Sequence, residues 1–243
     1  MEPVIACMAT FPPRYEMAKR TARDLAKQVD ELHLYVNNRV TDDLSWLHHI
    51  PPNINPIIGS KTVGRLGDVG KFFPLQYIPR KAHVLLVDDD INYPANYAER
   101  MVRKIHLYDK SYVVGVHGCN LPNENVSSYY RNGQLKKVHF HKSLNHDRPV
   151  HLLGTGTAAF YKQRVGIKLD YFETQNMADI WLARYCQDKN IGMMMVSRDR
   201  TWLTANKTPD GGIYRKYKDR DTVQTFLVNE YEWSLNAHTK KLS

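Results

Sequence analysis

The sequence predicts an α/β fold, with a mostly parallel central sheet flanked by helices and a second half of mixed strand order. The run Val84-Leu85-Leu86-Val87 supports this, because consecutive aliphatic residues are typical of a strand buried on both faces of a parallel sheet. Apolar and amphipathic segments also alternate over residues 1–90, which is the order of βαβ units. The length of 243 residues fits a single domain.

The first half predicts a strand, a helix and a second strand in succession. Residues 4–8 are apolar and predict the first strand, and residues 15–30, rich in Ala, Lys and Arg, predict an amphipathic helix. Residues 32–36 predict the second strand, so the three elements form a right-handed βαβ unit. Further along we expect a proline-rich connection over 51–59 that includes a short strand at 57–58, a glycine-containing loop over 64–71, an apolar segment at 75–78, a strand over 84–90 and a helix over 95–108.

The second half predicts short strands between polar loops. A helix is expected over 174–189, followed after one more strand by a mobile loop over 206–222, which is polar and has Pro209-Asp210-Gly211-Gly212 at its centre. A short amphipathic helix over 223–237 then closes the chain. Strands are expected over 112–116, 138–141, 152–153, 158–161 and 193–196.

The composition narrows the class of protein. No apolar run approaches the roughly 18 residues that cross a bilayer, and the amino terminus lacks the order of a signal peptide, so we expect a cytoplasmic protein. The three cysteines are widely spaced and predict neither a disulfide framework nor a zinc knuckle. The net charge of +9 favours anionic partners, and peripheral contact with the inner surface of a membrane stays open. Because the basic residues are dispersed, no nucleic-acid partner is expected.

Three adjacent carboxylates, Asp88-Asp89-Asp90, follow the aliphatic run directly. Their charges repel one another, so the cluster is costly unless a cation or several donors offset it. The carboxyl end of a strand in an open α/β sheet is where ligands bind, so a hard divalent ion that carries phosphate oxygens is the expected partner. Mg²⁺ and Mn²⁺ both suit oxygen ligands. The alternative is that the carboxylates cap the next helix, for which one Asp would be enough.

The order of motifs resembles the GT-A (Rossmann-like) fold of nucleotide-sugar glycosyltransferases, of the family 2 type, over about residues 3–205. The resemblance rests on the loop Thr10-Phe11-Pro12-Pro13-Arg14, the segment Gly67-Asp68-Val69-Gly70-Lys71, the Asp-any-Asp motif Asp88-Asp89-Asp90, the segment Gly154-Thr155-Gly156, and the helix start Asn176-Met177-Ala178-Asp179.

The resemblance implies one domain in which about residues 1–110 bind the nucleotide and about residues 111–205 form the acceptor and catalytic half. It implies transfer of a sugar from a UDP-sugar to a glycan or lipid-linked glycan. Synthesis of bacterial surface polysaccharide is the setting by analogy of fold.

The resemblance also implies roles for single residues. Asp90 would ligate the metal ion, Asp88 would lie nearer the ribose or phosphate as a second ligand, and Asp89 completes the motif. A downstream histidine often joins the metal in this fold, and His238 is the candidate, with His117 as the other possibility.

The nucleoside and sugar are expected to contact the neighbouring segments. Thr10 and Arg14 would hold the nucleoside, the alternative being a turn with a surface arginine. Asp68 would accept from the base and Lys71 would meet a phosphate, the alternative being an ordinary glycine turn. The sugar would lie against backbone that glycine leaves open, at Gly154, Thr155 and Gly156, for which a bulged strand is the alternative.

Asp179 is the candidate catalytic base. It lies in the first turn of the predicted helix, and inverting transfer needs one carboxylate to take the proton of the acceptor hydroxyl. An acidic residue at a helix start is also favourable through the helix dipole alone. Many proteins of this fold carry Glu-Asp where this chain has Ala178-Asp179, so the chain departs from the pattern at residue 178. It keeps the aspartate, and the expectation of an inverting reaction rests on Asp179.

Two other function classes compete. A sugar nucleotidyltransferase also combines a Rossmann-like half with carboxylate-bound Mg²⁺, but it would carry a glycine-rich basic loop where this chain has Thr10-Phe11-Pro12-Pro13. The other class is a non-enzymatic module that binds a glycan or nucleic acid.

Overall fold

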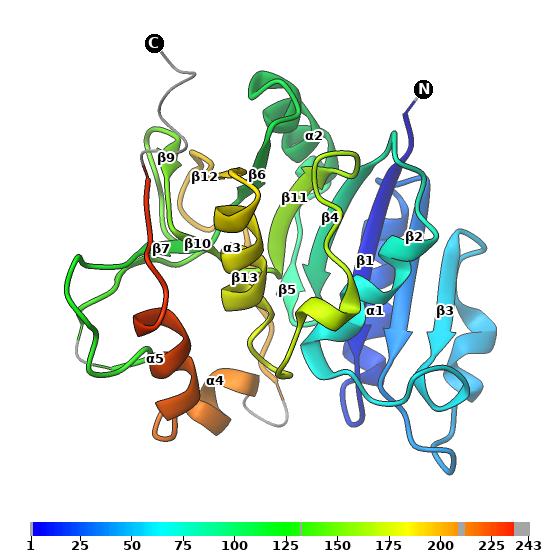
Figure 1. Cartoon of the computed structure of the whole chain (residues 1–243). Helices are drawn as coiled ribbons and strands as arrows, with labels where there is room; N and C mark the ends of the chain where they lie inside the picture. The colour runs from blue at the N-terminus through cyan, green and yellow to red at the C-terminus, as the bar shows by residue number, and fades with distance from the viewer. Residues whose placement is uncertain (1, 132, 209–211, 236–243) are drawn as a thin grey trace.

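The chain forms a mixed sheet of eight strands with helices on both faces (Figure 1). This computed structural model describes residues 2–131, 133–208 and 212–235. The strand order of the large sheet is β3-β2-β1-β4-β11-β6-β12-β9. Its strands are β1 (Val4–Thr10), β2 (Glu31–Val36), β3 (Ile54–Ile58), β4 (His83–Asp88), β6 (Tyr112–Gly115), β9 (Arg148–Pro149), β11 (Thr157–Tyr161) and β12 (Gly192–Met195).

Two small sheets and several helices complete the fold. One small sheet joins β10, β7 and β8, and the other joins β13 to β5. The strands of the small sheets are β5 (Ile91–Asn92), β7 (Gly118–Asn120), β8 (Lys136–Val138), β10 (Leu152–Leu153) and β13 (Thr204–Ala205). The α-helices are α1 (Tyr15–Ala26), α2 (Tyr97–Leu107), α3 (Ala178–Asp188), α4 (Gly212–Tyr217) and α5 (Thr222–Asn229), and the 3-10 helices are η1 (Ser45–His49), η2 (Gly59–Lys61), η3 (Gly67–Gln76) and η4 (Leu169–Tyr171).

The predicted α/β class with a mostly parallel sheet is confirmed. Strands β3, β2, β1 and β4 run parallel, and β6 and β12 form a second parallel pair. Strand β11 lies antiparallel between β4 and β6 and joins the two sets. The aliphatic run of β4 is therefore buried at the junction of the parallel and mixed halves, because helices cover both faces there.

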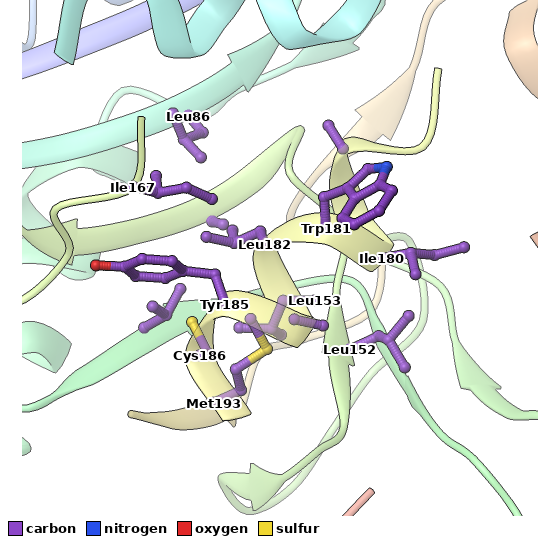
Figure 2. Packing of buried hydrophobic residues seen from close by; sticks show 14 of the residues in the cluster. Leu86, Leu152, Leu153, Ile167, Ile180, Trp181, Leu182, Tyr185, Cys186 and Met193 are labelled. Carbon is purple, nitrogen blue, oxygen red and sulfur yellow. The ribbon is translucent and has the colours of Figure 1, made fainter. Parts of the chain in front are cut away.

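The sheet separates two cores, and β1 shows how the sequence builds both. Alternate side chains of a strand point to opposite faces, so Ile5 and Cys7 pack with η3 and α3, whereas Ala6 and Met8 pack with α1 and α2. Figure 2 shows the first core, in which Trp181, Leu182 and Tyr185 of α3 lie among side chains of the strands and of residue Ile167.

Several predicted boundaries were wrong in the first half. The strand expected over 84–90 ends at Asp88, and the next two residues form a turn into β5, because Asp89 is drawn inward by hydrogen bonds described below. The loop expected over 64–71 is helical from Gly67, since η3 continues through the apolar segment. Helices α1 and α2 are shorter than expected at their ends, and β3 starts earlier, with Pro56 on the edge strand.

The second half departs further from prediction. The helix expected from residue 174 begins at Ala178, because Asn176 has a φ of 63°, a left-handed conformation that a helix does not continue through. The strand expected over 138–141 is β8, which ends at Val138.

The carboxyl-terminal predictions also need correction. The stretch 206–222 is not a loop throughout: residues 212–217 form α4, while residues 209–211 lie outside the described residues. The helix expected over 223–237 ends at Asn229, where the side chain of Asn229 bonds both the N–H and the carbonyl of Val126 instead. Residues 236 and 237 are outside the described part of the chain.

Candidate functional site

The candidate site lies at the carboxyl ends of β1 and β4 (Figure 1). The chain order of the strands reverses at β1, since β2 lies on one side of it and β4 on the other. Ligands of open α/β sheets bind in the crevice at such a switch point. The predicted site residues come from the ends of these strands, from η3, from the turn before β11 and from the start of α3.

Asp89 is buried and held by residues from the end of β1, from the start of α1 and from within α1. Its Oδ2 accepts a hydrogen bond of 2.8 Å from the Thr10 hydroxyl, and its Oδ1 pairs with the Arg14 guanidinium at 2.8 Å. The Thr21 hydroxyl donates to the Asp89 carbonyl at 2.9 Å. Burial raises the pKa of Asp89, and the charge of Arg14 with the Thr10 hydrogen bond offsets part of the rise. The middle carboxylate therefore anchors the turn.

Arg14 is not a surface residue, which excludes the alternative of a simple exposed turn. It is 7% exposed, and the same nitrogen that binds Asp89 lies 3.2 Å from Asp90 Oδ2. Because both Thr10 and Arg14 point at the carboxylate turn, their contact with a nucleoside stays a prediction.

Asp88 is paired with Lys71 of η3. The Lys71 ammonium donates to Asp88 Oδ1 and is itself only 2% exposed. Burial alone would lower the pKa of Lys71, but the Asp88 carboxylate outweighs it, with help from Asp68 and Asp179, so the pKa is raised. The Asp88 side chain keeps 40% of its surface exposed. A carboxylate that is fixed at one oxygen and open to solvent can still bind a ligand.

Gly156 and Tyr93 set the place of Asp88. A Cβ on Gly156 would lie 2.0 Å from Asp88 Oδ2, so only glycine leaves room for the carboxylate. The Tyr93 hydroxyl accepts the Asp88 N–H at 2.8 Å and donates to the Gly156 carbonyl at 2.5 Å. Tyr93 thereby ties the end of β4 to the turn before β11, and we had not identified it from the sequence.

We expect Gly156→Ala to displace the Asp88 carboxylate, since the added methyl cannot coexist with it. The expected cost is about 1–3 kcal/mol in the free energy of unfolding, with weakened Mn²⁺ binding. Urea denaturation and Mn²⁺ titration check both effects. Gly166→Ala is the matched control, because its nearest neighbour would be the Tyr185 hydroxyl at 3.6 Å. Equal stability of both variants would contradict the close approach.

Asp179 lies in the first turn of α3, close enough to Lys71 and Asp88 for their charges to act on its carboxylate. Its Oδ1 accepts hydrogen bonds of 2.7 Å from both the N–H and the hydroxyl of Thr155. Burial raises the pKa of Asp179, and the Thr155 hydrogen bonds and the charge of Lys71 offset part of the rise. Within the described part of the chain, Oδ2 has no hydrogen-bond donor, so this oxygen is free to accept a proton from a bound hydroxyl.

Asp68 holds the start of α3 in place. Its two oxygens accept the N–H groups of Asn176 at 2.6 Å and Ala178 at 3.0 Å. Burial raises its pKa to about 6. Asp68 is thus a cap supplied by a distant segment. The role predicted for it, recognition of the base, stays untested.

Asn37 holds the start of η3. Its side-chain oxygen accepts the N–H groups of Leu66 and Gly67, and its amide donates to the Gly67 carbonyl at 3.0 Å. The sequence shows Asn37 only as the end of a strand, so this role was missed.

The glycine segment forms a turn beside His117. The Gly154 N–H donates to the His117 carbonyl at 2.9 Å, and the Thr157 N–H closes the turn on Gly154 at 3.0 Å. Burial lowers the pKa of His117 to about 3, so this imidazole is neutral. The other histidine candidate, His238, lies outside the described residues.

Asp90 carries the excess charge of the cluster. Its pKa is raised to about 7, first by burial and then by the charges of Asp88 and Asp89. Arg14 and Lys71 are two cations against the three carboxylates of the motif, and Asp68 and Asp179 add further acidity. Oxygen donors with an excess of negative charge suit a hard divalent ion. The binding of Mn²⁺ or Mg²⁺ by Asp88 and Asp90 stays a prediction.

We expect Asp90→Asn to be more stable than the parent at pH 8 in the absence of metal, by about 1–3 kcal/mol. The raised folded-state pKa means that ionised Asp90 opposes folding, and this penalty disappears as the pH falls from above 7 towards the ordinary value near 4. The advantage of the variant should therefore shrink over that window. Denaturation of both proteins between pH 5 and pH 8 measures the difference in their free energies of unfolding. The histidines are the same in both proteins, so their contributions cancel in this difference. If Asp90→Asn were more stable than the parent by the same amount at every pH, the raised pKa of Asp90 would be refuted.

No protein family model matches the chain, and no curated protein matches it either. Among the described residues, no helix is both long enough and apolar enough to cross a membrane.

Proposed function

We propose that the chain is a metal-dependent glycosyltransferase of the GT-A type, which moves a sugar from a nucleotide-activated donor to a hydroxyl of a glycan or lipid-linked glycan. The observation that carries this is the meeting of the Asp-any-Asp motif with a second acidic group. Lys71 donates a hydrogen bond to Asp88, and the charges of Asp68 and Asp179 also raise the pKa of Lys71. The carboxylates that we propose as metal ligands and the carboxylate that we propose as the base thus lie near the same buried ammonium.

In the proposed transfer, Asp88 and Asp90 act on the leaving group and Asp179 acts on the acceptor. The leaving group is a diphosphate whose charge grows as the glycosidic bond breaks, and a divalent ion at Asp88 and Asp90 would neutralise it. Arg14 adds a fixed cation beside Asp90, at 3.2 Å. Asp179 takes the proton of the acceptor hydroxyl at Oδ2, while Thr155 orients it through Oδ1.

The neighbouring backbone supports a sugar between these groups. In the turn from Gly154 to Gly156, Thr155 bonds Asp179 and the next residue, Gly156, packs against Asp88. We propose that the donor sugar binds at this turn, between a diphosphate on the side of Asp88 and Asp90 and an acceptor hydroxyl on the side of Asp179. A single base opposite the leaving group favours inversion, and we propose an inverting reaction on that ground.

UDP is the proposed nucleotide and Mn²⁺ or Mg²⁺ the proposed ion, as the resemblance implies. We further propose that the enzyme acts in the cytoplasm or at the inner surface of a membrane, where a bacterial surface polysaccharide would be assembled. The excess of basic residues over acidic ones is compatible with anionic donors and surfaces.

A thermal-shift screen of nucleotide sugars, with and without Mn²⁺, identifies the donor, because a ligand that binds the folded state raises its melting temperature. The identified donor is then incubated with Mn²⁺ and a panel of glycan acceptors. Release of nucleoside diphosphate together with a glycosylated product supports the proposal. Asp90→Asn should lose the metal-dependent shift and the product.

The competing functions are tested by changing the substrates of this assay. A nucleotidyltransferase would release pyrophosphate from a nucleoside triphosphate and a sugar phosphate. A non-enzymatic binding module would bind a glycan with no product, and Asp90→Asn would bind it equally well. Either result would overturn the proposed transfer.

A further inference from the structure

A second cluster of titratable groups lies at the opposite end of β1 and β4 from the carboxylate motif. Glu2 precedes β1, His83 is the first residue of β4, and His106 lies in the last turn of α2. Parallel pairing places Val4 opposite His83, and the His83 N–H bonds the Pro3 carbonyl at 2.8 Å, so the two strand starts are fixed together. Figure 1 shows the amino terminus and α2 at this end.

The donor atoms of the cluster have the spacing of metal ligands. His83 Nε2 lies 3.1 Å from His106 Nε2 and 3.8 Å from Glu2 Oε2, and the three atoms all lie within 4.8 Å of one another. Two ligands of a tetrahedral zinc ion, each about 2.0–2.2 Å from it, are separated by roughly 3.4 Å. The observed separations bracket that value.

We propose that Glu2, His83 and His106 form a binding site for Zn²⁺ or a similar borderline divalent ion. Imidazole and carboxylate are ligands that such ions accept, and two nitrogens among three ligands select against Mg²⁺, which prefers oxygen. The site is separate from the carboxylate motif and does not depend on the proposed glycosyltransferase activity.

Two of the three ligands, His83 and Glu2, are already in the forms that bind a metal. His83 is 3% exposed, and its pKa is lowered by burial and by the neighbouring His106, which favours the neutral imidazole. Glu2 is ionised, because hydrogen bonds from Lys110 and Tyr161 lower its pKa to about 2. His106 is exposed, so an ion can enter from solvent and keep water in its remaining position.

Two features limit the affinity. The Lys110 ammonium lies 2.5 Å from Glu2 Oε2, the same oxygen that faces His83, and its charge competes with a cation. The other oxygen, Oε1, accepts from the Tyr161 hydroxyl at 2.6 Å and would keep the carboxylate oriented if Lys110 moved away. His83 Nδ1 is buried with no hydrogen-bond partner among the described residues, so a proton placed there by metal binding is poorly satisfied. We therefore expect micromolar binding.

The test is a Zn²⁺ titration of the full chain, free of any affinity tag, in excess Mg²⁺ to occupy the carboxylate site. Calorimetry should give one Zn²⁺ per chain, and Co²⁺ in its place should give the absorption of a low-symmetry nitrogen and oxygen site. Because His106 is exposed, His106→Ala should fold normally and bind at least about 10-fold more weakly.

Lys110→Met and Asp90→Asn sharpen the test. Lys110→Met removes the competing charge and should bind Zn²⁺ about 3–10-fold more tightly. Unfolding of the variant would weaken Zn²⁺ binding, so tighter binding cannot be explained by a folding defect. Asp90→Asn should bind Zn²⁺ as the parent does. The proposal is overturned if the parent takes up no Zn²⁺, if His106→Ala binds it equally well, or if only Asp90→Asn loses it.

Discussion

Asp179→Asn should lose about 10²–10⁴-fold in kcat while donor binding stays within a factor of a few. Asparagine has the same shape, and its side-chain oxygen can still accept the two Thr155 hydrogen bonds of 2.7 Å. What disappears is the oxygen that accepts the proton. Since the charge of Asp179 lies near Asp88 and is partly buried, removing it should leave the fold at least as stable.

Separate measurement of kcat, of KM for the donor and of UDP–Mn²⁺ affinity checks this prediction. A loss confined to kcat identifies a group needed in the transition state. Thr155→Val is the companion variant, because it removes the hydroxyl donor but keeps the backbone N–H, and it should cost much less in rate. Weaker donor binding with unchanged turnover of Asp179→Asn would make Asp179 a binding residue instead.

The parts of the fold that could be predicted from sequence are those with a local signal. The aliphatic run before the carboxylates predicted β4 correctly because burial on two faces demands it at every position. The prediction that Asp179 lies in the first turn of a helix is also confirmed, and the helix dipole makes an acidic residue favourable there. Boundaries failed where a distant group decided them, as at Asn176, whose N–H bonds Asp68 more than a hundred residues earlier in the chain.

In the site, too, features with a local signal in the sequence could be predicted, and features decided by distant residues could not. Three adjacent identical residues have three different environments: Asp88 pairs with Lys71, Asp89 is buried on Arg14, and Asp90 remains the least compensated. Nothing in the triplet itself distinguishes its members, because the distinction comes from cations that other elements deliver. Tyr93 was missed for a related reason, since its hydroxyl bonds backbone groups at the end of β4 and in the turn before β11, which only the folded chain brings together.

Asp88→Ala is expected to destabilise the protein by about 2–4 kcal/mol, which is the other large effect. Breaking a buried ion pair from one side costs about 3–5 kcal/mol, because the remaining charge is left unpaired, and the partial exposure of Asp88 reduces this. Lys71 is 2% exposed and would lose its direct partner. Asp90→Ala is the matched control from the same motif, and it should stabilise the metal-free protein, since its carboxylate is the one that its neighbours repel.

The pH dependence and a second substitution separate this pair from simple loss of packing. Without Asp88, burial dominates and should lower the folded-state pKa of Lys71 below its unfolded value. The unfolded state then binds the proton more tightly, so the deficit of Asp88→Ala should shrink as the pH rises from 7 towards 10. Lys71→Met combined with Asp88→Ala should recover part of the loss, because no unpaired charge remains at position 71. Urea denaturation of the four proteins of this cycle measures the coupling. A deficit that neither the pH nor Lys71→Met reduces would mean that Asp88 stabilises the fold through packing, and that the Lys71 contact contributes little.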